Sequence, residues 1–361
     1  MSFKLLPYVE PDFSKLSAAP DARLVPAPAD GVVSEGYHSM SIFPEYIKKD
    51  GKWQLVRESR MDCAAVWEDG EFKVKEFRNI QKGEPVVMGR SEDGSEGIYV
   101  YPDGFRRPDD KRDIFAFRQG RSRETSFTRD YEELYELLRH EKDNGKIVWV
   151  LGPAFAFDWD AREAFARLVR GGYVHALMAG NALATHDLEA AYLGTALGQD
   201  VRSGESRPLG HYNHLDTINR VRHYGSIEKF IEGEHIDNGI IQACVEKNVP
   251  IVLAGSIRDD GPLPPVIGNV YGAQDAMRDQ LRSATTVICL ATMLHTIATG
   301  NMTPSYRVLP DGRVRQVYFY CVDISEFTLN KLSDRGSLSA RSIVTNVQDF
   351  SVNVAKGLGL M

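Results

Sequence analysis

From Asp130 onward, helix-like segments alternate with short apolar runs, and this alternation restricts the fold of the chain more than any other feature. Helical patterns are expected at 131–143, 160–170, 188–193, 215–223, 226–232 and 240–248. Apolar runs of strand length are expected at 147–152, 174–179, 250–254, 286–291 and 317–322. Strands that alternate with helices build right-handed βαβ units around a parallel sheet. The sequence therefore predicts an α/β domain with a five-stranded parallel sheet over residues 121–361.

Residues 1–120 show a different sequence pattern. They contain short alternating segments that are broken by Asp-Gly turn signals at 30–31, 50–51, 69–70 and 103–104. Flanking runs such as 61–67 and 97–101 have strand character. We therefore expect a smaller β-rich N-terminal domain over 1–120, followed by a charge-rich connector at 106–123.

Composition excludes several classes of function. The 361 residues carry a formal net charge of −7, so the chain has no basic surplus with which to neutralise nucleic-acid phosphates. Apolar runs such as 286–293 are too short to span a bilayer, and the N-terminus lacks a signal-peptide apolar core. The four cysteines show no CxxC spacing, and those at 244, 289 and 321 are expected to be buried free thiols. We expect a cytoplasmic protein that binds neither nucleic acid nor membranes and holds no metal.

The strand expected at 250–254 is followed by a cluster of charged residues. Gly255-Ser256 ends the apolar run, and Arg258, Asp259 and Asp260 follow before a stiff, proline-rich segment. Ligands in open α/β sheets bind beyond the carboxyl ends of the strands. There, Arg258 can bind a carboxylate through two hydrogen bonds, and Asp259 or Asp260 can hold an ammonium group or a ribose hydroxyl. The alternative is an Arg-Asp pair that only caps a turn.

Other strand ends carry small or acidic residues. The segments 152–154, 180–182 and 254–256 allow close approach of the backbone to a dinucleotide, although the chain has no GxGxxG fingerprint. Asp323, at the end of the 316–322 run, can accept hydrogen bonds from ribose hydroxyls or, alternatively, cap the next helix.

The histidines give a second set of candidates. His295 follows the 286–291 strand and suits a general base at neutral pH, although a lone histidine is more often a structural residue bonded to a backbone carbonyl. The polar cluster His211-Tyr212-Asn213-His214 precedes a helix, and together with Asp216 it is a weak zinc signal. His186 either faces the same cleft or is a solvated residue near a helix start.

Long segments of the chain resemble the LOR/SDH conserved-region family. That family comprises archaeal-type ornithine cyclodeaminases and the C-terminal part of the bifunctional cyanobacterial arginine dihydrolase/ornithine cyclodeaminases. The matching segments are AGNALATHDLE (179–189), GHYNHLDTINRVRHYGSIE (210–228), NVPIVLAGSIRDDGPLPPV (248–266), AQDAMR (273–278), LATMLHTIATGN (290–301), VDIS (322–325), DRGS (334–337), APADGVVSEGYHSM (27–40) and RMDCAAV (60–66). The resemblance covers most of the chain.

The resemblance implies an NAD-dependent conversion of L-ornithine to L-proline and ammonia on a Rossmann-like domain similar to that of deoxyhypusine synthase. The resemblance points to His295 as the catalytic histidine, which we expect to accept a proton; for the same reaction we expect Arg258 to bind the substrate carboxylate and Asp259 the distal ammonium. Asn213 and His214 are further substrate-binding candidates. The expected NAD-binding residues are Gly180, Asn181, Ala182, Asp260, Gly261, Thr292 and Asp323. The Trp-Gly-Lys of the synthase has no counterpart in 303–315, which argues against transfer to a lysine.

The chain departs from the family at 37–44. Where the family commonly shows Phe-Tyr-Ser-Thr-Thr-Asn-His-Pro, this chain has Tyr-His-Ser-Met-Ser-Ile-Phe-Pro. If that loop covers the substrate pocket, a different or more apolar amino acid is expected. The chain also lacks the arginine-hydrolysing domain of the bifunctional relatives, so no guanidine hydrolysis is expected.

Two other functions fit the same residues. One is an NAD(P)-dependent amino-acid or opine dehydrogenase with net turnover of the cofactor. The other is a non-catalytic module that senses NAD or an amino acid. The likeness to the synthase further implies a homodimer or homotetramer with NAD at a subunit interface.

Overall fold

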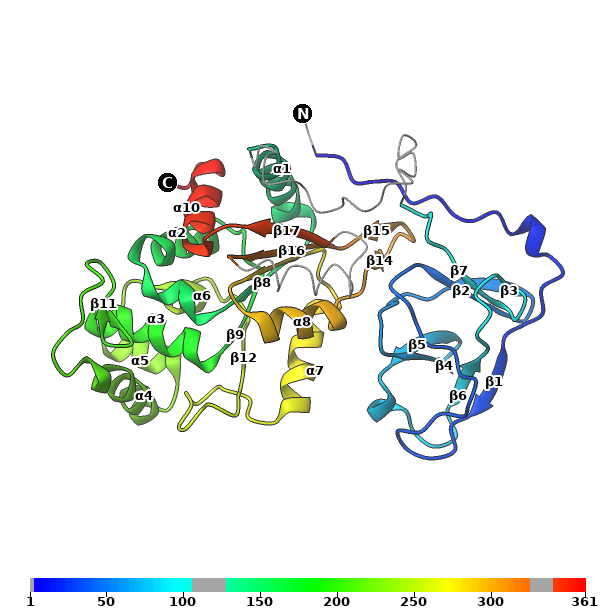
Figure 1. Cartoon of the computed structure of the whole chain (residues 1–361), viewed down its shortest axis with the longest axis horizontal. Coiled ribbons are helices and arrows are strands. Elements are labelled where there is room, and N and C mark those ends of the chain that lie inside the picture. The colour runs from blue at the N-terminus through cyan, green and yellow to red at the C-terminus, as the bar shows by residue number, and fades with distance from the viewer. Residues whose placement is uncertain (1–2, 106–127, 325–339) are drawn as a thin grey trace.

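The computed structural model describes residues 3–105, 128–324 and 340–361. A β-rich domain (blue to cyan in Figure 1) lies beside a larger α/β domain (green to red). The expected boundary at 120/121 and the connector at 106–123 lie outside the described residues. Phe3 packs on the α/β domain, where its ring centroid is 5.4 Å from that of His140 and 5.8 Å from that of Tyr318. Phe3 and Leu5 therefore pack on the second domain, although both precede the strands of the first.

The α/β domain is built on a six-stranded parallel sheet. Its strands are β8 (Ile147–Leu151), β9 (Ala176–Gly180), β12 (Ile251–Ala254), β13 (Thr286–Leu290), β16 (Tyr318–Asp323) and β17 (Ala340–Val344). They lie side by side in the order β12-β9-β8-β13-β16-β17. Numbered along the chain, this is the order 3-2-1-4-5-6 of dinucleotide-binding folds. The predicted α/β class and parallel sheet are confirmed, and the expected count of five strands was one too few.

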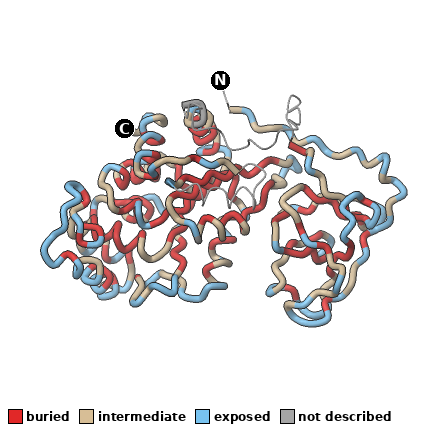
Figure 2. Tube along the Cα trace, in the orientation of Figure 1, coloured by how far each residue is buried: buried red, intermediate tan, exposed pale blue. Residues whose placement is uncertain are grey.

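Alternate residues of each strand face two different layers, as the period of a strand requires. Ile147, Trp149 and Leu151 of β8 face a large core. This core is completed by α1 (Thr128–Asn144), α2 (Trp159–Arg170), α3 (Asn181–Leu193), α4 (Asn213–Tyr224), α5 (Ile227–Gly233), α6 (Ile240–Glu246) and α10 (Val347–Gly357). Val148 and Val150 face a smaller core, to which, within the described residues, α7 (Val270–Leu281) and α8 (Met293–Met302) contribute. Figure 2 shows the buried strands between these layers.

The β-rich domain consists of two antiparallel sheets. One has the order β1-β6-β4-β5 and the other β3-β2-β7. The strands are β1 (Arg23–Pro26), β2 (Glu45–Lys49), β3 (Lys52–Leu55), β4 (Ala64–Glu68), β5 (Glu71–Lys75), β6 (Pro85–Met88) and β7 (Ile98–Val100). Asp50-Gly51 and Asp69-Gly70 form two-residue hairpin turns in which all four φ angles are positive. The β-rich character and these two turns confirm the prediction.

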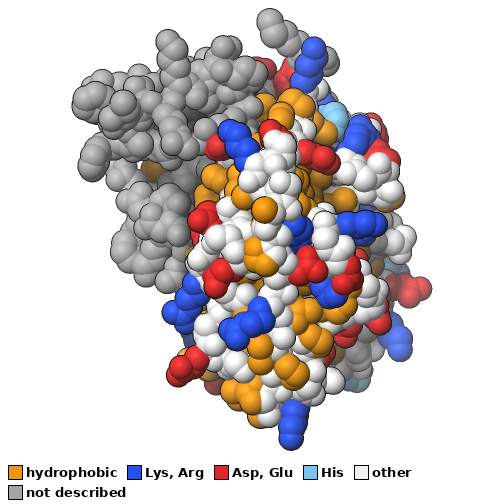
Figure 3. Space-filling view, turned by 90° about the vertical axis from the view of Figure 1, so that its right-hand side faces the viewer, with side chains coloured by type: hydrophobic (Ala, Val, Ile, Leu, Met, Phe, Trp, Pro, Cys, Tyr) orange, Lys and Arg blue, Asp and Glu red, His pale blue; other side chains and the backbone are white. Residues whose placement is uncertain are grey.

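Short elements connect the larger ones in the described part of the chain. They are the 3₁₀ turns η1 (Phe13–Leu16), η2 (Phe77–Asn79), η4 (Pro153–Phe157) and η5 (Gly210–Tyr212), and the short strands β10 (Thr195–Ala196), β11 (Gln199–Asp200), β14 (Tyr306–Val308) and β15 (Val314–Gln316). No helix within the described ranges is long and apolar enough to cross a membrane. On the face of the molecule shown in Figure 3, positive, negative and apolar side chains are interspersed.

The two domains meet at α7 and at the segment after α8. Arg278 of α7 lies 2.9 Å from Glu76, and Asp275 lies 2.7 Å from Arg78 of η2. The hydroxyls of Ser305 and Tyr306 donate to backbone carbonyls of the first domain. These contacts fix the first domain against helices that follow strands β12 and β13.

Candidate functional site

Parallel strands bring their carboxyl ends to one edge of the sheet, and β8 and β13 meet there at the point where the strand order reverses. The amide of Gly152, directly after β8, donates to the carbonyl of Leu290 at 2.8 Å. A Cβ at Gly152 would collide with the carbonyl oxygen of Ala291. Only glycine allows this close approach, and open α/β sheets bind ligands at such a reversal.

The turn into α8 brings His295 over a neighbouring strand end. Ala291 has a φ of +51°, an uncommon conformation for a non-glycine residue, and α8 begins two residues later. His295 lies in the first turn of α8, and a Cβ added to Gly180 would lie 3.1 Å from its Cε1 atom. Because β8 lies between β9 and β13, the imidazole reaches past the end of β8 to that of β9.

The environment of His295 favours its neutral form. Burial lowers the pKa of the imidazole, and the charge of Asp259 partly offsets this effect. A neutral imidazole can accept a proton, as a general base must. Three strand ends thus converge at this point: that of β9 through Gly180, that of β12 through Asp259, and that of β13 through His295.

The segment 255–266 forms a loop that is closed at its neck. The amide of Ile267 donates to Leu253 at 2.9 Å, and the amide of Gly255 donates back to Ile267 at 3.0 Å. Inside the loop, Oδ2 of Asp259 accepts from the amide of Ser256 at 2.8 Å. The loop therefore returns to the edge of the sheet with its charged residues at the tip.

The two charged residues proposed to bind substrate have different surroundings. Asp259 is half-buried and stabilises the turn with one carboxylate oxygen, which fits part of the turn-capping alternative. Arg258 is exposed, and its guanidinium forms no ion pair with any residue of the described part of the chain. The Arg-Asp pair considered as an alternative is therefore not formed among these residues, and the guanidinium is left to meet a ligand.

Asn181 connects the start of α3 to the loop. Its Oδ1 accepts from the amide of Leu263 at 3.0 Å and from the hydroxyl of Thr185 at 3.3 Å. Leu263 is buried in the main core, so this bond holds the returning limb of the loop against α3. The side-chain oxygen of Asn181 thus has a structural role. The neighbouring Gly180 and Ala182 place backbone groups at the carboxyl-end edge of the sheet.

Two helices at this edge begin without a side-chain cap. Gly180 precedes α3 and Thr292 precedes α8, and neither side chain caps its helix. By contrast, Asp158, Asn269 and Asn346 cap α2, α7 and α10 with their side chains. Uncapped N-termini present free N–H groups and the positive end of the helix dipole, which suit the phosphates of a dinucleotide.

The other expected cofactor residues lie at the two sides of this edge. Asp323 ends β16 and is half-buried, and its carbonyl accepts from the amide of Thr345 at 3.2 Å. The alternative role of Asp323 as a helix cap involves residues outside the described ranges. Asp260 is exposed in the loop, and Gly261 is half-buried near Arg222.

Asn213 and His214, at the start of α4, belong to a separate group with His186 and Glu189 of α3. Asn213 donates to the hydroxyl of Thr195 at 2.8 Å, and the ring of His214 lies 6.2 Å from that of His186. The fully buried Glu189 bonds His186 at 3.0 Å. The structure does not bring Asn213 and His214 into contact with Arg258, Asp259 or His295. In the described part, no three His, Cys, Asp or Glu side chains form a metal-binding group.

The loop 37–44 packs away from His295. Met40 is buried in the core of the first domain, and the carbonyl of Ile42 accepts from the hydroxyl of Ser305. Ser305 follows the C-terminal end of α8, whereas His295 lies in its first turn. Within one chain, these contacts place the altered loop at the opposite end of α8 from the candidate base.

Two further features do not contribute to the site. All four cysteines are buried free thiols, as expected for those in apolar segments, and burial raises the pKa of Cys63 to about 11.

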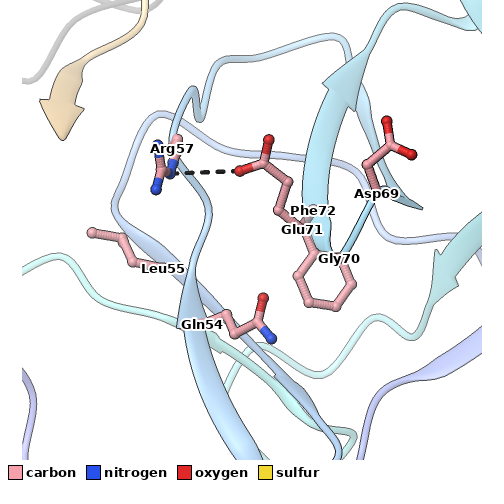
Figure 4. A pocket seen from close by; sticks show the side chains of 7 residues that line it. All are labelled: Gln54, Leu55, Arg57, Asp69, Gly70, Glu71 and Phe72. Carbon is pink, nitrogen blue, oxygen red and sulfur yellow. Dashed lines mark ion pairs between the residues drawn. The ribbon is translucent and has the colours of Figure 1, made fainter. Parts of the chain in front are cut away.

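A hollow of about 390 Å³ lies in the first domain between β3 and the β4–β5 turn (Figure 4). It is lined by Gln54, Leu55, Arg57, Asp69, Gly70, Glu71 and Phe72. Arg57 and Glu71 already face each other across it at 3.6 Å.

The fold and the edge together define a class of protein. A sheet in the 3-2-1-4-5-6 order, a glycine contact at its reversal point and a half-buried histidine nearby describe a Rossmann-type domain with a site for a dinucleotide and a small polar ligand. Residues 132–354 match the C-terminal Rossmann fold of ArgZ-like arginine dihydrolases, and residues 44–130 match the first region of the same C-terminal part. The chain belongs to this ArgZ-like C-terminal family.

Known proteins are similar to the chain over most of its length. An ornithine cyclodeaminase of Methanopyrus kandleri is 41% identical over 341 residues, which are 94% of this chain and 78% of that protein. A conserved LOR/SDH protein from Methanococcus maripaludis S2 superposes with a TM-score of 0.83 at 34% identity, covering 94% of this chain and 98% of that one. AgrE in a ternary complex with ornithine and NAD⁺ superposes with a TM-score of 0.60 at 34% identity, covering 94% of this chain and 46% of AgrE.

Proposed function

We propose that the chain is an NAD-dependent ornithine cyclodeaminase, which converts L-ornithine to L-proline and ammonia. The observation that carries the proposal is the convergence of His295, Gly180 and Asp259 at the reversal point of a dinucleotide-type sheet. Relatives named ornithine cyclodeaminase that are 36–41% identical to the chain, and the complex of AgrE with ornithine and NAD⁺, support this choice of substrate and cofactor.

The residues at the edge fit NAD. The glycine contact at 152 leaves no side chain between β8 and β13, and Gly180 adds none at the end of β9. Residues proposed to hold NAD are Gly180, Asn181, Ala182, Asp260, Gly261, Thr292 and Asp323. Bound NAD⁺ supplies reversible acceptance of a hydride, so loss of ammonia from ornithine needs no outside oxidant or reductant.

The chain itself supplies orientation and proton transfer. Arg258 binds the substrate carboxylate, and the half-buried carboxylate of Asp259 attracts the distal ammonium. His295, neutral because of its burial, takes a proton from the α-ammonium and leaves a neutral amine at the reacting carbon. Asn213 and His214 remain further candidates for substrate binding.

We also propose that the protein acts in the cytoplasm, in proline biosynthesis, as a homodimer or homotetramer. Large apolar side chains stand exposed after three of the strands that end at this edge, β12, β13 and β16: Ile257 (106% exposed), Met293 (44%) and Ile324 (74%). Apolar residues that rim a binding edge are typical of a surface covered by a partner. A second copy on this edge would exclude water from the reacting carbon. Light scattering of the purified protein and of an Ile257→Asp variant tests this assembly.

The decisive test is incubation of the purified protein with L-ornithine, with and without added NAD⁺, with proline, ammonia and NADH measured together. Proline and ammonia in equal amounts without net NADH support the cyclodeaminase. Net formation of NADH would instead identify an amino-acid dehydrogenase. Absence of any product from ornithine, lysine or diaminobutyrate, with NAD still bound, would point to a sensing module.

A further inference from the structure

One face of α7 is occupied by the first domain along its whole length. The residues on this face are Tyr271, Asp275, Arg278 and Arg282, which follow the i, i+4, i+7, i+11 spacing of a single helix face. Each contacts a charged residue of the first domain. The residues between them, Ala273, Met277 and Leu281, pack on the parallel sheet. The helix is therefore held between the sheet and the first domain.

The contacts are tightest over the first three turns of α7. The guanidinium of Arg78 lies 4.9 Å from the ring centroid of Tyr271, and its Nη2 is 2.7 Å from Oδ1 of Asp275. Deeper in the interface, Oε1 of Glu76 lies 2.7 Å from Arg60 and 2.9 Å from Arg278. At the far end, Arg282 lies 3.8 Å from Glu58, beyond hydrogen-bonding distance.

The start of α7 is directly connected to the candidate site. Ile267 pairs with β12 at the neck of the 255–266 loop, and Asn269, two residues later, caps α7 through the amide of Gly272 at 2.8 Å. Only Gly268 separates the neck from the cap. A shift of the first turn of α7 must therefore move the neck, and with it the loop that carries Arg258 and Asp259.

We propose that Arg78 of the first domain is a positioning residue that, through Asp275 and Tyr271 of α7, sets the position of the 255–266 loop and so the affinity for substrate. This proposal rests on the proposed function in that the ligand of the loop is taken to be an amino-acid carboxylate. The first domain thereby has a role in the site although none of its described contacts reaches His295.

The test compares Arg78→Gln with Arg282→Gln. Both variants remove one arginine charge from the same interface, but Arg282 lies three turns from the loop and makes only a long contact with the first domain. In Arg78→Gln, we expect the KM for ornithine to rise about tenfold while kcat changes less than about twofold, since a displaced binding group weakens substrate binding more than chemistry at His295. Asp275→Asn should shift KM in the same direction; it also removes the 2.9 Å pair with Arg278, so the double variant should resemble Asp275→Asn alone.

Hydrogen exchange of the backbone amides provides a readout that does not need activity. In Arg78→Gln, the amides of Leu263 and Ile267 should exchange faster than in the wild-type protein. In Arg282→Gln, the exchange rates of these amides should stay unchanged. The two variants should have the same melting temperature. Equal exchange and equal KM in the two variants would overturn the proposal. If the wild-type protein makes no proline, the proposed function fails, and the exchange comparison still decides whether Arg78 positions the loop.

Discussion

The imidazole of His295 lies over the backbone of Gly180, so close that a methyl group on the glycine would approach Cε1 to 3.1 Å. Gly180 is the last residue of β9 and His295 follows β13, and the two meet because β8 alone lies between those strands. The position of the proposed base therefore depends on a residue 115 positions away in a chain of 361 residues.

Gly180→Ala is expected to displace the imidazole by a few tenths of an ångström and to lower kcat about tenfold. The backbone of Gly180 is extended, with φ of −97° and ψ of 172°, so alanine itself is not strained there. Gly268→Ala is the matched control, because nothing lies within 4 Å of its added Cβ. Steady-state kinetics and thermal melts of both variants check this, and an unchanged kcat in Gly180→Ala would contradict the assigned contact.

His295→Ala is expected to lower kcat about 10²- to 10⁴-fold, the usual contribution of a general base. In the wild-type protein, activity should rise with pH through a pKa below the ordinary histidine value of 6.5, because burial favours the neutral form and the neutral form is the active one. His223→Ala, at an exposed position of α4, should leave both rate and pH profile unchanged. A pH–rate profile of each variant measures this, and full activity in His295→Ala would exclude His295 as the base.

Arg258→Gln should raise the KM for ornithine about 10- to 100-fold, since it removes a charge-assisted, two-bond contact with the carboxylate. Its exposed guanidinium has no structural ion pair among the described residues, so the melting temperature should stay constant. Arg313→Gln, which removes an exposed arginine paired with Asp311, serves as the control. If both variants show the same KM, the carboxylate is bound elsewhere.

Asp187→Asn should destabilise the fold by about 3–5 kcal/mol, because it leaves the guanidinium of Arg162 buried without its counter-ion. The two side chains are 2.8 Å apart and each is 1% exposed. The exposed pair of Arg167 and Glu163 has the same distance, and Glu163→Gln should cost less than about 1 kcal/mol. Urea unfolding of the two variants makes the comparison, and equal losses would mean that burial does not govern the strength of these pairs.

Glu76 should stabilise the protein against acid. Burial would raise the pKa of its carboxyl, but the guanidiniums of Arg60 and Arg278 outweigh that effect and hold it at about 2. A depressed carboxyl pKa contributes stability above the unfolded value of about 4.5, and this contribution is lost as the pH falls from 4.5 through about 2. The difference in unfolding free energy between wild type and Glu76→Gln should therefore shrink over that window. A difference that stays constant from pH 6 to pH 2.5 would contradict the ion pairs.

The sequence predicted five strands of the parallel sheet well, edge strand β12 included, and missed the other edge strand, β17. β8 and β13 are buried along their whole length and stand out as apolar runs, whereas Ala340–Val344 of β17 has one fully buried residue in five and follows a polar stretch. Helix α8 was not expected either, because its residues 293–302 mix threonine and glycine with apolar side chains and show no clear polar face.

The charged loop could be predicted as a feature, but its internal bonds could not. Arg258 and Asp259 stand out because charges directly after a buried strand serve no packing purpose. Asp259 stabilises the turn by accepting from the amide of Ser256, and Asn181 accepts from the amide of Leu263. These bonds depend on distances between backbone amides and side chains, which residue types do not reveal. The convergence of His295 with Gly180 likewise depends on strand order, and apolar runs carry no information about which strands are neighbours.

The carboxylate of Asp158 accepts from the amide of Ala161 at 2.7 Å and so occupies the N-terminus of the helix that follows the first strand of the sheet. In dinucleotide folds with the glycine fingerprint, that terminus receives the pyrophosphate. Here an anion would meet a like charge, and apart from Gly152, which the close contact with Ala291 requires, the chain has no need of the other glycines of the fingerprint. A protein can therefore keep this strand order without the GxGxxG fingerprint. A search for such folds that relies on the fingerprint will miss enzymes built like this one.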